Sequence, residues 1–199
     1  MISIGGNKLS KGLKNTLIVI GVLIVLIFPV ISTYNKMIAS EQNVIKLSSN
    51  IDTDLKRRSD LIPNLVETTK GYAAHEKEVF TDIANARAKL GGANTIQDKA
   101  NADSELSSAL SRLLVVVERY PELKSNENFR ALMIQLEGTE NRINVSRKDY
   151  NEAVASYNYS IKKFPASIIA SIFRFEPKEP YKADEASKEV PKVDFNTGK

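Results

Sequence analysis

The residues from Leu17 to Ile31 read LIVIGVLIVLIFPVI, fifteen positions without a charged or polar side chain. Uncharged Thr16 and Ser32 to Tyr34 extend this apolar segment to about 19 residues, which at ~1.5 Å per residue nearly span the ~30 Å hydrocarbon core of a bilayer. A helix over these residues has no polar face, which argues against the buried core helix of a soluble protein. We therefore predict a transmembrane helix over residues 16–34.

A short basic segment, residues 1–15, precedes the apolar segment and contains no acidic residue. A basic stretch before a short apolar core is also typical of a cleaved signal peptide. The sequence Ser-Thr-Tyr-Asn-Lys after the core contains no clean small-x-small cleavage site, which favours an uncleaved, single-pass anchor. Membrane lipid is then a predicted partner of the chain, through its N-terminal helix.

The lysines around the anchor predict its orientation. Lys8, Lys11 and Lys14 lie before the apolar segment, whereas only Lys36 and Lys46 lie in the fifteen residues after it. The positive-inside rule then places the short N-terminus in the cytoplasm and the bulk of the domain outside the cytoplasm.

The composition indicates one folded, mainly helical domain behind the anchor. The chain of 199 residues is 42% hydrophobic and 26% charged, and it has no cysteine, which excludes disulfides and thiolate metal sites. The lysines before the apolar segment account for three of the four net positive charges. The rest of the chain therefore lacks the concentrated positive charge of a phosphate-binding surface, and we expect no nucleic-acid partner.

A stripe of mostly apolar residues recurs in alternating steps of four and three, the pattern of a helix that packs in a bundle. The stripe comprises Ile51, Leu55, Arg58, Ile62, Leu65, Thr69, Tyr72, Glu76, Val79, Ile83, Ala86 and Leu90. Arg58, Thr69 and Glu76 interrupt it, and such interruptions are more often solvated edges than buried polar sites.

Pro63 falls inside this pattern, where it removes one helical hydrogen bond unless it lies in the first turn of a new helix. Ser59 and Asp60 just upstream are good N-cap residues. Two readings remain open: one long helix kinks at Pro63, or a helix over about 34–58 ends and another over about 60–90 begins.

Two further helices are predicted after Gly91-Gly92, which ends the preceding element. One carries Leu106, Leu110, Leu113, Val117 and Tyr120 and stops at Pro121. The next begins near Ser125 or Asn126 and ends at Phe164-Pro165, with two lysines favourably placed in its last turn. The predicted fold class is therefore all-α: a transmembrane helix, then an up-and-down four-helix bundle over residues 35–175.

A short apolar patch follows Pro165. It consists of Ile168, Ile169, Ile172, Phe173 and Phe175. The patch either caps the bundle or touches the lipid surface, because the fourth helix of an up-and-down bundle returns to the end where the first began. Residues 176–199 are polar, balanced in charge and rich in proline, so most of this tail is expected to be extended and flexible.

Residue combinations that carry chemistry are nearly absent. His75 is the one histidine, and Val79 stands where a zinc protease helix has its second histidine. Without cysteine and with one histidine, the chain has almost no means to form a nucleophile-and-base pair. The basic stretch from Arg142 to Lys148 has acidic neighbours at helical spacing, which favours a solvated, salt-bridged face. We expect no catalytic residue, no metal site, no cofactor and no enzymatic activity.

Three strings resemble the signature of LemA family proteins: DLKRRSDLIPNLVET with KGYA in residues 54–73, a motif over residues 136–165 that ends in Phe164-Pro165, and PKVDF at residues 191–195. The residues that match the family motifs are Arg57, Arg58, Asp60, Pro63, Asn64, Glu140, Asn141, Arg142, Tyr150 and Asn151. The resemblance covers residues 16–195.

The resemblance implies an N-terminal membrane helix followed by a compact four-helix domain without established enzymatic activity, and it favours a helix break at Pro63. It further implies a bacterial protein with relatives among proteins that shape or organise magnetosome membranes. Some family descriptions place the short N-terminus outside the cell, opposite to the lysine-based prediction.

The leading functional hypothesis is a membrane-anchored helical scaffold or protein-interaction module whose protein partner is unidentified. Two alternatives remain: a membrane-surface remodelling or lipid-sensing protein, suggested by the apolar patch, and a non-catalytic accessory of an envelope enzyme. The sequence does not indicate the oligomeric state.

Overall fold

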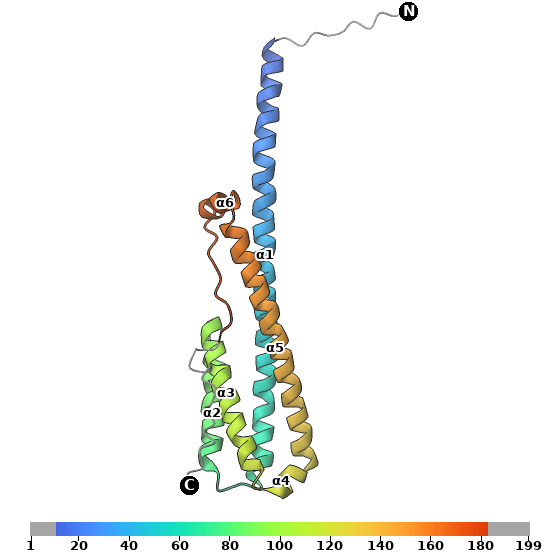
Figure 1. Cartoon of the computed structure of the whole chain (residues 1–199), viewed down its shortest axis with the longest axis vertical. Helices are drawn as coiled ribbons and strands as arrows, with labels where there is room; N and C mark the ends of the chain where they lie inside the picture. The colour runs from blue at the N-terminus through green and yellow to red at the C-terminus, as the bar shows by residue number, and fades with distance from the viewer. Residues whose placement is uncertain (1–10, 183–199) are drawn as a thin grey trace, which may run out of the picture. The chain divides into compact units, whose positions relative to one another are not determined.

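A computed structural model describes residues 11–182, and every regular element in that range is a helix (Figure 1). The elements are α1 (Lys11–Lys70), α2 (Lys77–Gly92), α3 (Ile96–Val117), α4 (Pro121–Ser125), α5 (Glu127–Lys162) and α6 (Ala166–Ile172). The all-α prediction is confirmed. The described chain divides into two compact units, one comprising residues 11–42 and 156–177 and the other residues 43–155 and 178–182.

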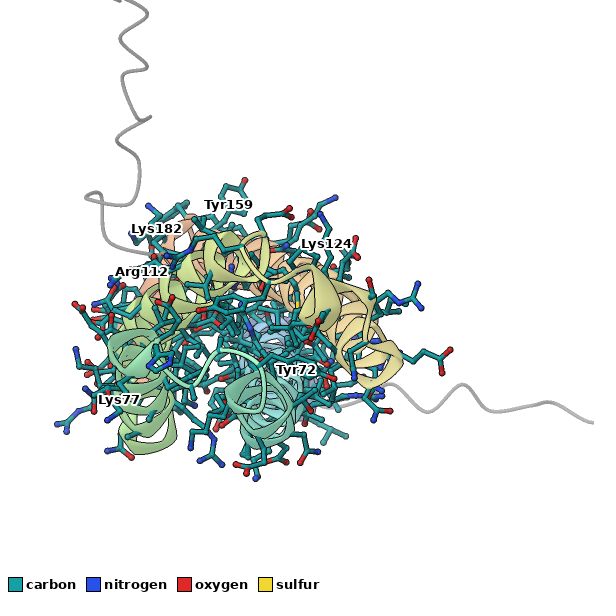
Figure 2. The ribbon with its side chains drawn as sticks, turned by 90° about the horizontal axis from the view of Figure 1, so that it is seen from below. Tyr72, Lys77, Arg112, Lys124, Tyr159 and Lys182 are labelled. Atoms are coloured by element: carbon teal, nitrogen blue, oxygen red, sulfur yellow. The ribbon has the colours of Figure 1, made fainter. Side chains whose placement is uncertain are left out.

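We call the second unit the bundle unit; it contains most of the residues predicted to form the helical bundle. It contains the C-terminal part of α1, the helices α2, α3 and α4, and α5 as far as residue 155; α2 and α3 lie side by side (Figure 1). The predicted stripe supplies much of its core: Ile51, Leu55, Ile62, Leu65, Ile83, Ala86 and Leu90 are all buried. Charged tips such as those of Lys77 and Lys124 point outwards (Figure 2).

The helix break that the resemblance favours at Pro63 is wrong, because α1 continues through Pro63 to Lys70. Proline has no amide hydrogen, so the Ser59 carbonyl loses its helical donor at this position. Arg87 of α2 replaces that donor, with Arg87 Nε lying 3.0 Å from the Ser59 oxygen. The chain instead leaves the helix at residues 71–76, where the amides of Tyr72 and Ala73 both donate to the Thr69 carbonyl.

The later helices begin and end close to where the sequence predicts. The Thr95 hydroxyl and the Asp98 side chain form a reciprocal capping box at the start of α3. The Asn126 side chain accepts a hydrogen bond of 3.0 Å from the Phe129 amide at the start of α5, as predicted for a helix that begins near Ser125 or Asn126. The short helix α4, with Pro121 in its first turn, connects α3 to α5.

The first unit, which we call the anchor unit, contains the N-terminal part of α1, the end of α5, and α6. All residues from Gly12 to Ile31 are exposed, although most of them are apolar. By length and composition this part of α1 is able to cross a membrane, and it is the one such segment within residues 11–182. Residues 1–10, with Lys8 and most of the basic N-terminal segment, lie outside the described range.

The beginning of the C-terminal tail is held against helices, and most of the predicted flexible tail, residues 176–199, lies outside the described range. Tyr181 is buried, and its amide and carbonyl exchange hydrogen bonds of 2.8 and 3.1 Å with the Asn151 side chain. The Tyr150 hydroxyl donates to the Glu179 carbonyl at 2.9 Å. We call residues 178–182 the strap. Residues 183–199, including the PKVDF motif, lie outside the described range.

Candidate functional site: a buried charge cluster and an apolar groove

Four charged side chains of the bundle unit form linked ion pairs around the buried Arg58 and Asp103. Arg58 of α1 lies 2.8 Å from Asp103 of α3 and 2.7 Å from Glu140 of α5, measured from Arg58 Nη1 to the carboxylate oxygens. Arg147 of α5 pairs with the second carboxylate oxygen of Asp103. The Arg58 and Asp103 side chains are 6% and 0% exposed. Two positive and two negative charges therefore balance one another across three helices.

Tyr181 of the strap covers this charge cluster. The Arg147 guanidinium lies 4.9 Å from the centre of the Tyr181 ring, a cation–π distance. The Tyr181 hydroxyl lies 3.3 Å from the Lys99 carbonyl and 3.4 Å from Asp103 Oδ2. The strap is thus tied to α3 and α5 through one aromatic side chain.

Burial perturbs the titration of the cluster. Desolvation lowers the pKa of the Arg58 guanidinium below its usual value, and the neighbouring Glu140 and Tyr181 oppose this effect. Burial also raises the pKa of the Tyr181 phenol, an effect that Arg147 opposes. Arginine stays protonated under all ordinary conditions, so Arg58 keeps its positive charge despite this lowered pKa.

The interpretation of stripe interruptions as solvated edges is wrong for two of the three positions. Arg58 and Thr69 are both buried, and the Thr69 hydroxyl donates a hydrogen bond of 2.7 Å to the Leu65 carbonyl. Glu76 is half-buried and pairs with Arg119 at 3.0 Å. The solvated face expected for Arg142 to Lys148 holds for the exposed Arg142 but not for the partly buried Arg147.

The structure brings together four of the residues that match the family motifs. Arg58 and Glu140 belong to the charge cluster, and Tyr150 and Asn151 bind the strap. The remaining motif residues lie on the exposed surface: Arg57, Asp60, Pro63, Asn64, Asn141 and Arg142. Sequence reasoning missed Asp103 and Tyr181; the one available signal was a stripe arginine that needs a buried acid as its partner.

An apolar groove of about 780 Å³ lies beside the cluster, between α3 and α5. Its apolar lining includes Leu110 and Leu114 of α3 and Met133 and Ile134 of α5. Leu114 and Ile134 are 43% and 70% exposed, so the apolar surface reaches the rim. Charged residues at the groove are Arg58, Lys124, Arg130, Glu137 and Glu140.

The predicted membrane-proximal patch lies in the anchor unit, on α6 and just after it. Ile168, Ile172 and Phe173 are exposed, whereas Ile169 and Phe175 are half-buried. Within residues 11–182, no three histidine, aspartate or glutamate side chains gather as ligands for a metal ion.

Comparison with known proteins assigns the chain to a protein family. It is 30% identical over 200 residues to magnetosome proteins MamQ 1 and MamQ 2 of Paramagnetospirillum magneticum, covering 86% of this chain and 74% of each relative. It is 25% identical over 146 residues to protein LemA of Metamycoplasma hominis, covering 72% of this chain and 66% of that protein. The LemA family model matches residues 47–195, which include the charge cluster and the strap. This chain belongs to the LemA family.

Proposed function

We propose that this protein is a membrane-anchored, non-catalytic helical scaffold that binds a protein partner in the groove between α3 and α5. The observation that carries the proposal is the construction of α1. Its N-terminal part is exposed and apolar over the length of a membrane span, while residues 43–70 of the same helix supply core residues to the bundle unit. One continuous helix thus links a lipid anchor to a water-soluble binding domain.

The shape and lining of the groove favour an amphipathic helix of the partner as the segment that binds there. Two helices form its walls, and apolar residues of α5 that line it recur at helical spacing, as in grooves that accept a third helix. Arg130 and Glu137 stand seven residues apart on α5, about 10 Å along the helix. A partner helix with an acidic residue opposite Arg130 and a basic residue opposite Glu137 complements this wall.

The balanced charge cluster supports the binding role over a catalytic one. Its ion pairs connect α1, α3 and α5, and therefore hold the two walls of the groove at a defined spacing. Both carboxylates of the cluster, Asp103 and Glu140, are paired with arginines, which supports a structural role for them. If the partner proves to be an envelope enzyme, the protein is that enzyme's accessory.

The lysines before the apolar segment support a cytoplasmic N-terminus and a bundle unit outside the cytoplasm. We expect a tag placed after Lys199 to be digested when intact cells are treated with protease. Retention of the tag until the membrane is permeabilised would reverse this orientation.

The groove is tested by cross-linking in native membranes with a photoreactive amino acid at Ile134. We expect a defined product whose partner peptide maps to an amphipathic helix, and we expect Leu114→Asp to abolish it. Val115→Asp is the matched control: Val115 is exposed on the same helix, but it does not line the groove. A product that survives Leu114→Asp, or one that both variants abolish, would contradict binding in this groove.

A further inference from the structure

Helix α6 buries its two alanines and leaves two of its three isoleucines exposed. Ala166 and Ala170 are each 4% exposed, whereas Ile168 is 54% and Ile172 is 69% exposed. Phe164 before the helix and Phe173 after it are also exposed. Burial of an isoleucine stabilises a protein far more than burial of an alanine, so this arrangement indicates that the outer face meets another apolar medium.

Aromatic contacts hold this region beside the end of the apolar segment of α1. The Tyr34 ring lies 4.7 Å from the ring of Phe173 and 5.7 Å from that of Phe175, measured between centroids. All three residues belong to the anchor unit. Tyr34 follows Ile31 by three residues, about 4.5 Å along the helix, which is the depth of the headgroup region if residues 17–31 fill the hydrocarbon core.

Three basic residues lie next to α6, and the nearest acidic residue in the chain is Glu176. Residues 156–175 contain Lys162, Lys163 and Arg174 and no acidic residue. All three basic residues are exposed. Arg174 occupies the left-handed region with φ 57°, and the Phe175 amide donates to the Ala170 carbonyl at 2.9 Å, which closes α6 with a Schellman-type turn. Glycine is the usual residue at such a position, so the backbone conformation does not explain why an arginine occupies it.

We infer that Phe164, Ile168, Ile172 and Phe173, which we call the α6 wedge, insert into the headgroup region of the bilayer that α1 crosses, beside anionic lipid phosphates bound by Lys162, Lys163 and Arg174. The inference rests on the proposed membrane anchor and adds a second lipid contact to it. Apolar side chains flanked by lysine and arginine are the composition of helices that lie in a membrane interface. The favoured ligand is a bilayer surface that contains anionic phospholipid.

The absence of cysteine allows a direct test with the full-length chain. Single cysteines at Ile172, Ile24 and Val145 are spin-labelled in vesicles of phosphatidylcholine with phosphatidylglycerol. Oxygen collides preferentially with labels in lipid, and a nickel chelate with labels in water. Val145 is the matched control, because it belongs to the bundle unit and is 60% exposed.

We expect the label at Ile172 to favour oxygen, though less than the label at Ile24, and the label at Val145 to favour nickel. If the label at Ile172 favours nickel like the label at Val145, while the label at Ile24 favours oxygen, insertion of the α6 wedge is contradicted and the membrane anchor is not. If Ile24 also lies in water, the anchor is overturned and the wedge with it. Spin–spin broadening between labels at Ile172 would identify a second copy of the chain as the occupant and overturn the lipid assignment.

Substitutions of Arg174 separate the lipid contact from folding. Arg174→Asn removes the charge and keeps a residue that tolerates the left-handed conformation. We expect it to leave thermal unfolding unchanged and to reduce the oxygen preference at Ile172 in vesicles that contain phosphatidylglycerol, with little effect in pure phosphatidylcholine. Arg174→Lys should restore the preference. Equal behaviour of Arg174→Asn and the unsubstituted chain in both lipids would overturn the phosphate contact.

Discussion

At the scale of single residues, the charge cluster is the feature that most distinguishes this bundle from an all-apolar one. Buried ion pairs add little to the free energy of unfolding, because the cost of removing both charges from water offsets most of their attraction. Their directional geometry does specify one arrangement of helices. Arg58 lies within ion-pair distance of both Asp103 and Glu140 in the observed register of α1, α3 and α5.

The cluster predicts a large penalty when its shared acid is removed. Asp103→Ala leaves Arg58 with Glu140 alone and removes the acidic partner of Arg147, and removing one partner of a buried ion pair typically costs about 3–5 kcal/mol. We expect a loss of this size in denaturant unfolding of the detergent-solubilised chain, followed by circular dichroism. Lys56→Ala removes the exposed Lys56–Asp60 pair and should cost about 0–1 kcal/mol. Similar losses for the two variants would mean that the cluster is solvated.

Tyr181 predicts a pH dependence of stability. Burial raises its pKa in the folded state above the ordinary value of about 10, so the folded state favours the protonated phenol. Its contribution to stability is therefore complete below about pH 10 and is lost as the pH rises through the folded pKa. Tyr181→Phe lacks this ionisation. The unfolding free energy of the parent chain should therefore approach that of the Tyr181→Phe variant above about pH 10. If the difference between the two unfolding free energies does not change with pH, the prediction is wrong.

At the scale of secondary-structure elements, α1 shows how a helix survives an internal proline. Pro63 removes one helical hydrogen bond, and the freed Ser59 carbonyl becomes an acceptor for Arg87 of α2. A local defect in one helix is thereby converted into a contact with another.

This exchange predicts coupling between Pro63 and Arg87. In the parent chain, Arg87→Ala should cost about 1–3 kcal/mol, because it leaves a partly buried carbonyl without a donor. In the Pro63→Ala background the alanine amide bonds to Ser59, so the same substitution should cost about 1 kcal/mol less. Urea unfolding of the four chains measures this double-mutant cycle. Additive effects would show that Arg87 acts independently of the proline.

At the scale of the whole molecule, anchoring depends on the apolar part of α1. Val25 is near the middle of the apolar segment and is exposed, so Val25→Arg should oppose insertion by about 2.5–3.5 kcal/mol. We expect the parent chain to stay in membranes during alkaline carbonate extraction and the variant to be released in part. Val115→Arg, an exposed position of the bundle unit, is the control and should stay with the membranes. Release of the parent chain would contradict the anchor.

The sequence by itself determined the features that depend on local periodicity and composition. An uncharged run of membrane length needs no tertiary partner to be recognised, and the four-three stripe identified Ile51, Leu65 and Ile83 as core residues before any packing was known. The start of α5 near Asn126 was likewise predicted, because the hydrogen bond that caps this helix reaches only three residues along the chain.

Only the tertiary structure decided the features that depend on residues distant in sequence. Arg58 is buried because Asp103 and Glu140 come from two other helices, and α1 continues through Pro63 because Arg87 supplies a donor from α2. The strap is placed by Asn151, thirty residues before Tyr181 in the chain. Periodicity reports which face of a helix is apolar, whereas the free energy of a buried charge or an unpaired carbonyl depends on what another element places against it.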